Sequence, residues 1–444
     1  MSRVQRPLPL RTPTVIVSTF RRFVEAQASG GITLLAAILA AIIWANLPAD
    51  SYDSFWNSHL TVSFRIFDAG FSLRDVVDQG LMTFFFLFVA LEIKREILVG
   101  ELASVRRAML PLFAAVGGMA LPAAIYLAVN LGHNSQGWAI PMATDIALVS
   151  GMMSLLSRKL PLSLQVFMLA LAILDDIAAI IVIALYYTGS VTLVPVVALV
   201  ALAGVLLAMS ALGIRHVWVY GSLGFLLWLG LLFAHIQATL AGVVLALAVP
   251  ARSRLSADQF LVSGRDLLGR FEQAASVDSC VLCTEEMGEV ARDLRTSAAH
   301  VRAPLSLLED ALRNWVVFLV MPIFALANGG IELNTGLLRG LGDPVVLGVI
   351  LGLIFGKQLG ILLFSRLSVA FRFARLPAGV TWSKTYSVAW LGGIGFTVAI
   401  FIANLAFDGS PLLPSIKGGI LIASAVSGLG GWLLLTRTHR VASR

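Results

Sequence analysis

The amino-acid sequence predicts an all-α membrane protein with about twelve transmembrane helices. Hydrophobic residues make up 58% of the 444-residue chain and charged residues only 13%, which is too little charge for the surface of a soluble protein of this length. A helix needs roughly 20 mostly apolar residues to cross a bilayer. Such stretches lie at 30–48, 76–99, 108–130, 138–156, 162–187, 192–212, 217–234, 236–250, 313–331, 345–368, 384–407 and 414–436.

The lysines and arginines predict how the chain is oriented. If the N-terminus lies inside and the loops alternate, nearly every basic residue falls on the cytoplasmic side. This is the positive-inside pattern of multi-pass proteins, so we expect both termini in the cytoplasm. A lipid bilayer, and not a nucleic-acid partner, then accounts for the formal net charge of +7. The basic residues expected outside are Arg65, Arg74, Arg339 and Lys417.

The spans also divide the chain into parts. We expect a cytoplasmic arm at 1–29, spans one to eight at 30–250, a cytoplasmic loop at 251–312, spans nine to twelve at 313–436 and a cytoplasmic tail at 437–444.

The long cytoplasmic loop holds the only cysteines, Cys280 and Cys283. A reducing compartment argues against a disulfide, and two ligands are half of what a structural zinc site needs. We expect a free, reduced pair, with metal binding or redox chemistry as the alternative. Pieces at 258–262 and 305–312 have the pattern of amphipathic helices. The loop is interpreted as a connector between two groups of spans, or alternatively as a regulatory element.

Residues 60–73, on the external side, predict a small β-hairpin. Apolar and polar residues alternate from Leu60 to Phe67, the run Asp68–Gly70 offers a turn, and the alternation resumes at Phe71. An isolated hairpin is marginally stable in water. We therefore expect this hairpin to pair with its twin in a second subunit, which would make the protein a homodimer.

The adjacent residues Asp175 and Asp176 are the strongest functional signal, because they lie in the middle of a long apolar stretch. A charge near the bilayer centre costs roughly 2.5–3.5 kcal/mol on insertion scales. Neighbours on a helix point about 100° apart, so the two carboxylates face different surroundings. Their repulsion favours the binding of protons, and carboxylate oxygens also suit hard cations such as sodium. A hydrogen bond between packed helices is the alternative, although one Asn or Ser would serve that purpose.

Two spans carry signals of a break in the helix. In the fourth span, Pro141 removes a backbone donor shortly before Thr144 and Asp145, which indicates freed backbone groups around a polar cavity. A simple proline kink is the alternative. In the eleventh span, the three glycines of 392–395 mark either a second unwound point or a surface for close helix packing.

Lys357 is a further charge deep in an apolar stretch, the tenth span. It needs a carboxylate or a polar cavity, and Asp145, Asp175 and Asp176 are the candidates; snorkelling to the interface is the alternative. The broken spans four and eleven each stand beside a span with a buried charge. This layout predicts inverted repeats formed by spans 3–5 and 10–12, and paired interrupted helices indicate a transporter site at the midplane.

Several stretches, in the same order along the chain, resemble the NhaA family of bacterial sodium/proton antiporters. The resemblance implies an electrogenic, pH-regulated antiporter of the cell inner membrane that extrudes sodium or lithium in exchange for external protons. It implies a secondary transporter with no enzymatic activity and no cofactor, two discontinuous helices that cross at the midplane, and dimerisation through an external hairpin. The matching stretches are Ala143–Ala147, Ala172–Asp176, Gly356-Lys357, Gly393–Thr397 and Phe85–Leu87 through Leu91–Glu96.

The same resemblance implies a role for each matching residue. Asp175 and Asp176 would bind the sodium ion and the protons, and Thr144 would add an oxygen ligand. Asp145 would balance the facing helix N-termini at the crossing, while Lys357 would balance the C-termini and pair with Asp175. The remaining acids are Asp78, near the funnel that leads to the site, and Glu92, Glu96 and Glu309, linked to pH response.

One departure concerns a histidine of the family pattern. The family commonly reads Gly-Val-His-Ala-Thr-Leu-Ala-Gly, and this chain reads His235-Ile236-Gln237-Ala238-Thr239-Leu240-Ala241-Gly242. Gln237 thus occupies the histidine position, so we expect the pH setting to differ. Two other functions are alternatives: an ion-coupled symporter of related fold, and an intramembrane aspartyl protease in which Asp145 and Asp175 face each other.

Overall fold

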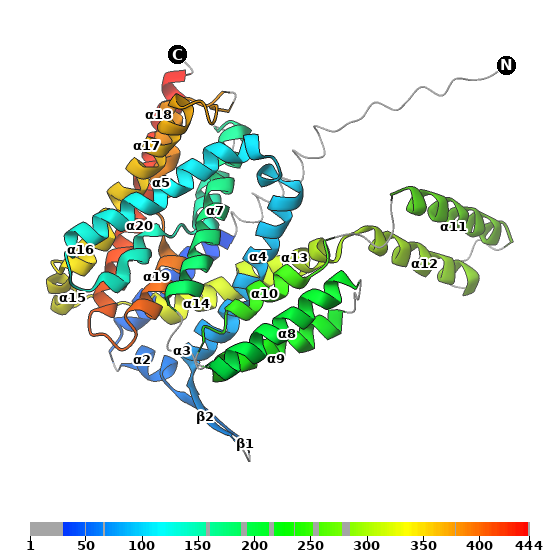
Figure 1. Cartoon of the computed structure of the whole chain (residues 1–444), viewed down its shortest axis with the longest axis horizontal. Helices are drawn as coiled ribbons and strands as arrows, with labels where there is room; N and C mark the ends of the chain where they lie inside the picture. The colour runs from blue at the N-terminus through cyan, green and yellow to red at the C-terminus, as the bar shows by residue number, and fades with distance from the viewer. Residues whose placement is uncertain are drawn as a thin grey trace. The chain divides into compact units, whose positions relative to one another are not determined.

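The computed structural model describes residues 30–48, 50–64, 67–156, 160–187, 193–212, 217–234, 236–251, 257–277, 285–377 and 379–442. These residues are almost entirely helical, as expected for an all-α membrane protein (Figure 1). They divide into two compact units. The first contains the described parts of Met1–Phe85, Val99–Gly189 and Val316–Arg444, and the second those of Phe86–Leu98 and Ser190–Trp315.

Among the described residues, 7 helices are long and apolar enough to cross a membrane, and a bent helix pair raises the number to 8. Three further apolar helices are shorter: Gly30–Ala45, Val197–Ser210 and Val219–Phe233. Helix α10 (Leu240–Ala248) has only 9 residues and is roughly 14 Å long, about half the thickness of the hydrocarbon core. A total of twelve spans therefore stays a prediction. The long helices are Leu73–Val99, Val105–Val129, Ser135–Leu155, Leu162–Tyr186, Pro304–Asn328, Pro344–Ala370 and Leu413–Arg437.

Both helix breaks predicted from the sequence are present in the first unit. In the fourth stretch, the 3-10 helix η3 (Ser135–Met142) and α6 (Ile146–Leu155) are separated by the extended residues 143–145. In the eleventh, α18 (Trp382–Leu391) and α19 (Phe396–Ala406) meet at an angle of 50°. The two breaks touch each other, because the backbone N–H of Asp145 donates to the carbonyl of Ile394 at 2.6 Å.

Helices α5 (Val105–Val129) and α17 (Lys357–Ala370) pack backbone against backbone in the same unit. Gly117 and Gly360 face each other so closely that a methyl group added to either one would overlap the carbonyl oxygen of the other. One turn earlier, a Cβ on Gly356 would lie 2.7 Å from the Cα of Pro122. These small residues bring the start of α17, and with it Lys357, into the interior of the unit.

The expected hairpin segment contains two paired strands, but their bounds and their turn differ from those predicted. Strands β1 (His59–Phe64) and β2 (Phe67–Ser72) are antiparallel, with His59 opposite Ser72 and Phe64 opposite Phe67. The turn placed at Asp68–Gly70 is wrong, because these residues pair within β2. The connection is the two-residue segment 65–66, which lies outside the described residues; two-residue connections are the commonest in hairpins.

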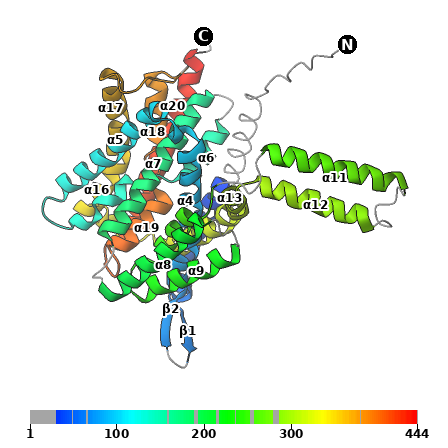
Figure 2. The same cartoon turned by 45° about the vertical axis from the view of Figure 1, so that its right-hand side comes forward.

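The second unit contains part of α4 (Met82–Val99), then α8 (Leu193–Ala211), α9 (Val217–Phe233), α10 and the helices of the long loop. The predicted amphipathic pieces are confirmed as parts of α11 (Ala257–Val277) and α13 (Pro304–Trp315). Between them, α12 (Glu285–Val301) lies alongside α11 (Figure 2). Cys280 and Cys283 lie outside the described residues.

The contact between α5 and α17 gives a direct test of the packing. We expect Gly360→Val to destabilise the protein by at least about 1–3 kcal/mol, because the added carbons overlap the Gly117 backbone. The matched control is Gly221→Val in α9, where nothing lies within 4 Å of an added Cβ. Thermal unfolding of the purified variants in detergent measures both. Equal stability of the two variants would contradict the packing.

Candidate functional site

The centre of the first unit holds a buried ion pair between Asp175 and Lys357. Asp175 lies in the middle of α7 (Leu162–Tyr186) and is 2% exposed, and Lys357 is 0% exposed. Lys357 Nζ lies 2.5 Å from Asp175 Oδ2. Two charges taken out of water are tolerated only when they meet in good geometry. Asp175 is therefore the partner that Lys357 needs, and the pair constrains where α7 and α17 lie.

Thr144 joins this pair to the two helix breaks. Its hydroxyl Oγ1 lies 2.6 Å from Asp175 Oδ2 and 3.0 Å from the carbonyl of Gly392. Asp176, the next residue on α7, is 4% exposed. Within the described residues, Oδ1 of Asp175 accepts no hydrogen bond. The structure thus brings Thr144, Asp175 and Lys357 together, with Asp176 adjacent on the chain.

A turn of π-helix explains how Lys357 is presented. Residues Gly352–Gly356 form this turn immediately before α17. Single π-turns inside helices recur at functional sites because the wider turn changes the direction of the side chains that follow. The sequence predicted a buried lysine but not this turn, and the glycines at both its ends were the available signal.

Asp145 satisfies the N-termini of both half-helices. Its Oδ1 accepts from the backbone N–H of Leu148 at 3.0 Å and so caps α6. Its Oδ2 accepts from the backbone N–H of Thr397 at 3.0 Å and from the Thr397 hydroxyl at 2.6 Å, at the start of α19. A carboxylate is stabilised by the positive end of a helix dipole, and here one side chain serves two ends. No role was predicted for Thr397.

Lys357 does not show all of its expected contacts. Its hydrogen bonds within the described part of the chain go to Asp175 alone. The expected balancing of the helix C-termini by Lys357 therefore stays a prediction.

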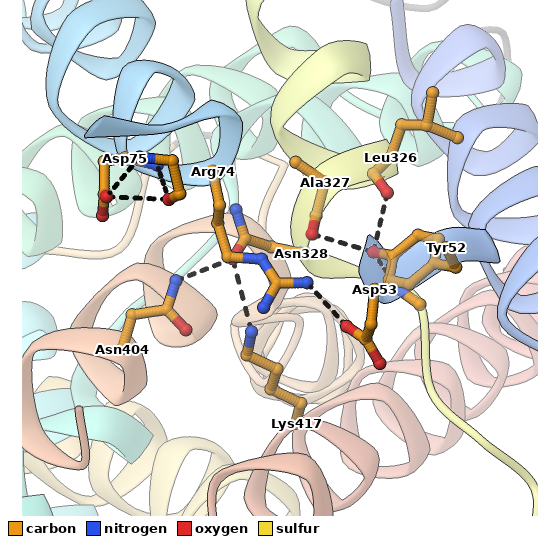
Figure 3. Close-up of polar contacts among 11 residues, drawn as sticks. Tyr52, Asp53, Arg74, Asp75, Leu326, Ala327, Asn328, Asn404 and Lys417 are labelled. Atoms are coloured by element: carbon orange, nitrogen blue, oxygen red, sulfur yellow. Dashed lines mark hydrogen bonds and ion pairs between the residues drawn. The ribbon is translucent and has the colours of Figure 1, made fainter. Parts of the chain in front are cut away.

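A second buried cluster surrounds Asp78. Of its residues, Asp78 alone was expected as a site residue from the sequence. Asn328 Nδ2 donates to Asp78 Oδ1 at 2.7 Å, and Asn404 Nδ2 donates to Asp78 Oδ2 at 3.1 Å. Lys417 Nζ donates to Asn328 Oδ1 at 3.3 Å. Figure 3 shows Asn328 with Asn404 and Lys417 around it, from α14 (Met321–Asn328), α19 and α20 (Leu413–Ala442). The signal that could have found the two amides is their position in otherwise apolar stretches.

Lys417, a basic residue expected on the external side, is buried in this cluster. It lies within α20 and is 7% exposed. A lysine can be buried where amide and carboxylate oxygens accept its hydrogens, and its position on the external side stays a prediction.

Tyr52 and Arg74 border the Asp78 cluster (Figure 3). Arg74 Nη2 lies 3.2 Å from Asp53 Oδ1. The Tyr52 hydroxyl lies 2.8 Å from the carbonyls of Leu326 and Ala327, and it accepts from the N–H of Gly330 at 3.1 Å. Burial raises the pKa of Tyr52 to about 12, so this hydroxyl stays protonated at neutral pH and ties α2 (Ser51–Trp56) to the end of α14.

In the second unit, two of the acids expected to respond to pH meet two arginines. Glu309 Oε1 lies 2.7 Å from Arg313 Nη2 and 3.3 Å from Arg95 Nη1, and Arg95 Nη2 lies 3.9 Å from Glu92 Oε1. Glu92 and Glu309 are 2% and 1% exposed, so these charges are shielded from salt and water. Glu96 and Gln237 are half-buried, and His235 lies outside the described residues.

Within the described residues, no group of three or more His, Cys, Asp or Glu side chains could hold a metal ion. The Asp175–Asp176 site has two carboxylates and a threonine hydroxyl.

Comparison with known proteins gives one consistent result. The profile of the family described as Na+/H+ antiporter 1 matches residues 21–435. A protein of Oleidesulfovibrio alaskensis named Na(+)/H(+) antiporter NhaA is 43% identical over 422 residues, which cover 95% of this chain and 94% of that one. Proteins of the same name from Koribacter versatilis and Sulfurimonas denitrificans are 42% and 39% identical over 98% and 95% of this chain, and over 94% and 95% of their own.

The Asp175–Lys357 pair predicts a specific rescue. Lys357→Met should destabilise the protein by about 3–5 kcal/mol, because it leaves a buried carboxylate uncompensated. Adding Asp175→Asn should restore part of the loss. The control is Lys417→Met, a buried lysine outside this pair, whose effect should simply add to that of Asp175→Asn. Thermal unfolding of the single and double variants measures the coupling, and additive losses for Lys357 and Asp175 would exclude the pair.

Proposed function

The chain belongs to the NhaA family of sodium/proton antiporters, and on that premise we propose that it exchanges sodium and protons at Asp175 and Asp176. The exchange is electrogenic, because two carboxylates serve one monovalent cation and more than one proton can move for each sodium ion. Lithium is the alternative cation, and the direction is sodium out and protons in.

The observation that carries the proposal is that, in the described part of the chain, one carboxylate oxygen of Asp175 is hydrogen-bonded and the other is not. Both of its polar partners, Lys357 Nζ and Thr144 Oγ1, contact the same oxygen, Oδ2. Oδ1 is buried and accepts no hydrogen bond within the described residues. A desolvated cation can therefore approach Oδ1 without first displacing a partner. Once bound, it would repel the Lys357 ammonium and weaken the ion pair, which couples ion binding to the contact between α7 and α17.

The broken spans support movement at this site. The breaks at 143–145 and 392–395 are hydrogen-bonded to each other and line Asp175 through Thr144. In the proposal they cross at the midplane within inverted repeats of spans 3–5 and 10–12, and rocking of this bundle exposes the site to either side. Asp145 keeps both half-helix N-termini satisfied in the process.

The Asp78 cluster is proposed to lie on the external route of the ions. It follows directly after the hairpin segment, at the start of Leu73–Val99. A carboxylate that is held by two amides offers its oxygens to a cation and is not engaged in a tight ion pair. Binding of the cation there is then weak enough for release, which an ion route requires.

The charges of Glu92, Arg95, Glu309 and Arg313 are the proposed basis of pH regulation. When a proton binds either acid, an ion pair to Arg95 or Arg313 is lost, and the contact between α4 and α13 weakens. Because Gln237 stands in place of the usual histidine and cannot take up a proton, the pH response is expected to come from Glu92 and Glu309. In the membrane, both termini are proposed to face the cytoplasm, and the hairpin of β1 and β2 to join two copies of the chain.

The protease alternative has little support in the geometry. A Gly-x-Gly-Asp stretch, common in such enzymes, occurs at Gly340–Asp343. Its aspartate caps a helix, since Oδ1 of Asp343 accepts from the N–H of Val345 at 2.8 Å. Both oxygens of Asp145 are likewise engaged by helix N-termini, so neither acid is placed to activate a water molecule.

Removing the second carboxylate tests the assignment of the ion site. We expect Asp176→Asn to abolish exchange in proteoliposomes while insertion and folding are retained, because a neutral amide cannot bind a proton or balance a cation. Asp408→Asn, an exposed carboxylate, serves as the control and should exchange at the rate of the unmodified protein. Wild-type rates in the Asp176 variant would exclude this site.

The competition between the two ions gives a pH dependence of known sign. As pH falls, protons occupy the shared carboxylates, so the apparent sodium affinity should weaken steadily between about pH 9 and pH 6.5. The maximal rate at saturating sodium should stay nearly constant until a regulatory threshold. Liposome assays over a pH series measure both quantities. A sodium affinity that does not change with pH would show that protons and sodium use separate sites.

A further inference from the structure

A cavity of about 700 Å³ opens in the first unit at a distance from the ion site. Its walls come from the beginning of α5, the beginning of α7 and the segment that follows α17. These are the ends of the helices that the charge distribution places on the cytoplasmic side. None of the functional residues discussed above lines it.

The charged residues that line the cavity are mostly positive. Four arginines, Arg106, Arg107, Arg372 and Arg375, line it against a single acid, Glu101. Arg107 pairs with Glu101 at 3.5 Å, and the other three arginines form no ion pair within the described part of the chain. Such a concentration of positive charge repels sodium and attracts anions. The cavity is therefore unsuited as a route for the transported cation.

The remainder of the wall is apolar and continues onto an exposed surface. Leu110, Pro111 and Phe167 are buried in it, and Phe373 stacks on Phe113 with the ring planes 7° apart and the centroids at 5.5 Å. Phe371 and Phe373 are 67% and 55% exposed. A basic rim next to an apolar wall fits a ligand that has both an anionic group and hydrocarbon chains.

The backbone at Arg372 ends α17 and fixes where this arginine lies. Its φ of 61° lies in the left-handed region, which is uncommon for a residue other than glycine. This conformation places an arginine at the cavity between two exposed phenylalanines. It belongs to the usual C-terminal cap of a helix, in which the N–H of Phe373 donates to the carbonyl of Ser368 at 2.9 Å and that of Arg372 to the carbonyl of Val369 at 3.1 Å.

We propose that this cavity binds the phosphate group of an anionic phospholipid from the inner leaflet. Arg106, Arg372 and Arg375 would surround the phosphate, and the acyl chains would lie along Phe371 and Phe373. The bound lipid would hold α5, α7 and the end of α17 together. Since α7 carries Asp175 and α17 begins with Lys357, the lipid would stabilise the elements that form the ion site.

Lipid binding to the purified, detergent-solubilised protein tests the proposal. Phosphatidylglycerol should raise the unfolding temperature and remain bound in native mass spectrometry, whereas phosphatidylcholine should do neither. The variant Arg372→Gln with Arg375→Gln should bind phosphatidylglycerol about thirtyfold more weakly, the effect of two basic residues near a lipid surface. The control with the same loss of charge is Arg265→Gln with Arg270→Gln on α11, which should bind like the unmodified protein.

Three results would overturn the proposal. Equal effects of the two lipids would mean that charge is not recognised, and equal losses in both double variants would mean that binding is unspecific. Stabilisation by inorganic phosphate to the same extent as by phosphatidylglycerol would assign the cavity to a free anion. Arg106→Gln, on a different helix, is measured in parallel, so the test stands even if the double variant is too unstable to purify. None of these outcomes depends on transport.

Discussion

A lysine and an aspartate without access to water can both stay charged only if they meet, and in this protein their meeting fixes the relation of three helices. Asp175 and Lys357 are separated by 182 positions in the chain, so the ion pair requires α7 and α17 to lie together. Helix α5 makes this possible, because Gly117 meets the backbone of Gly360 directly and Gly118 leaves room for the side chains of Lys357 and Ile361. A buried ion pair contributes little net stability, so the close packing of the glycines supplies the stability and the pair specifies the geometry.

The same constraint governs the broken spans. Unwinding a helix inside a membrane exposes backbone groups that lipid cannot satisfy. Here each break provides for the other: Ile394 accepts from Asp145, Gly392 accepts from Thr144, and the Asp145 carboxylate accepts from the first turns of α6 and α19. The breaks are thus stable only as a pair. This mutual dependence explains why Thr144 and Asp145, which are consecutive, serve different partners: Thr144 contacts Asp175 and Asp145 contacts the helix ends.

The residues that the sequence predicted best are those that violate a composition rule. Asp145, Asp175, Asp176 and Lys357 stand out because a charge in an apolar stretch needs a reason, and the structure places them in one region. Asn328 and Asn404 were missed because an amide in such a stretch is a weaker anomaly, and their meaning depends on Asp78, which lies more than two hundred positions away. The alternation of apolar and polar residues indicated two strands, but it does not mark the position of the turn between them. Gly70 suggested a turn at a position that lies within β2. The number of spans could not be fixed because composition does not show where an apolar stretch stops being helical.

The two buried clusters of the first unit differ in a way that fits their proposed roles. At Asp175 the carboxylate faces a full positive charge at 2.5 Å, so a cation must compete with an ammonium group and its binding changes the contact between two helices. At Asp78 the hydrogen-bond donors within the described residues are neutral amides, and the hydrogen bond of Lys417 goes to Asn328. A site whose occupancy must trigger movement needs the first arrangement, because charge displacement is what transmits binding to the helices. A site on the route needs the second, because an ion that displaces nothing can leave as easily as it came.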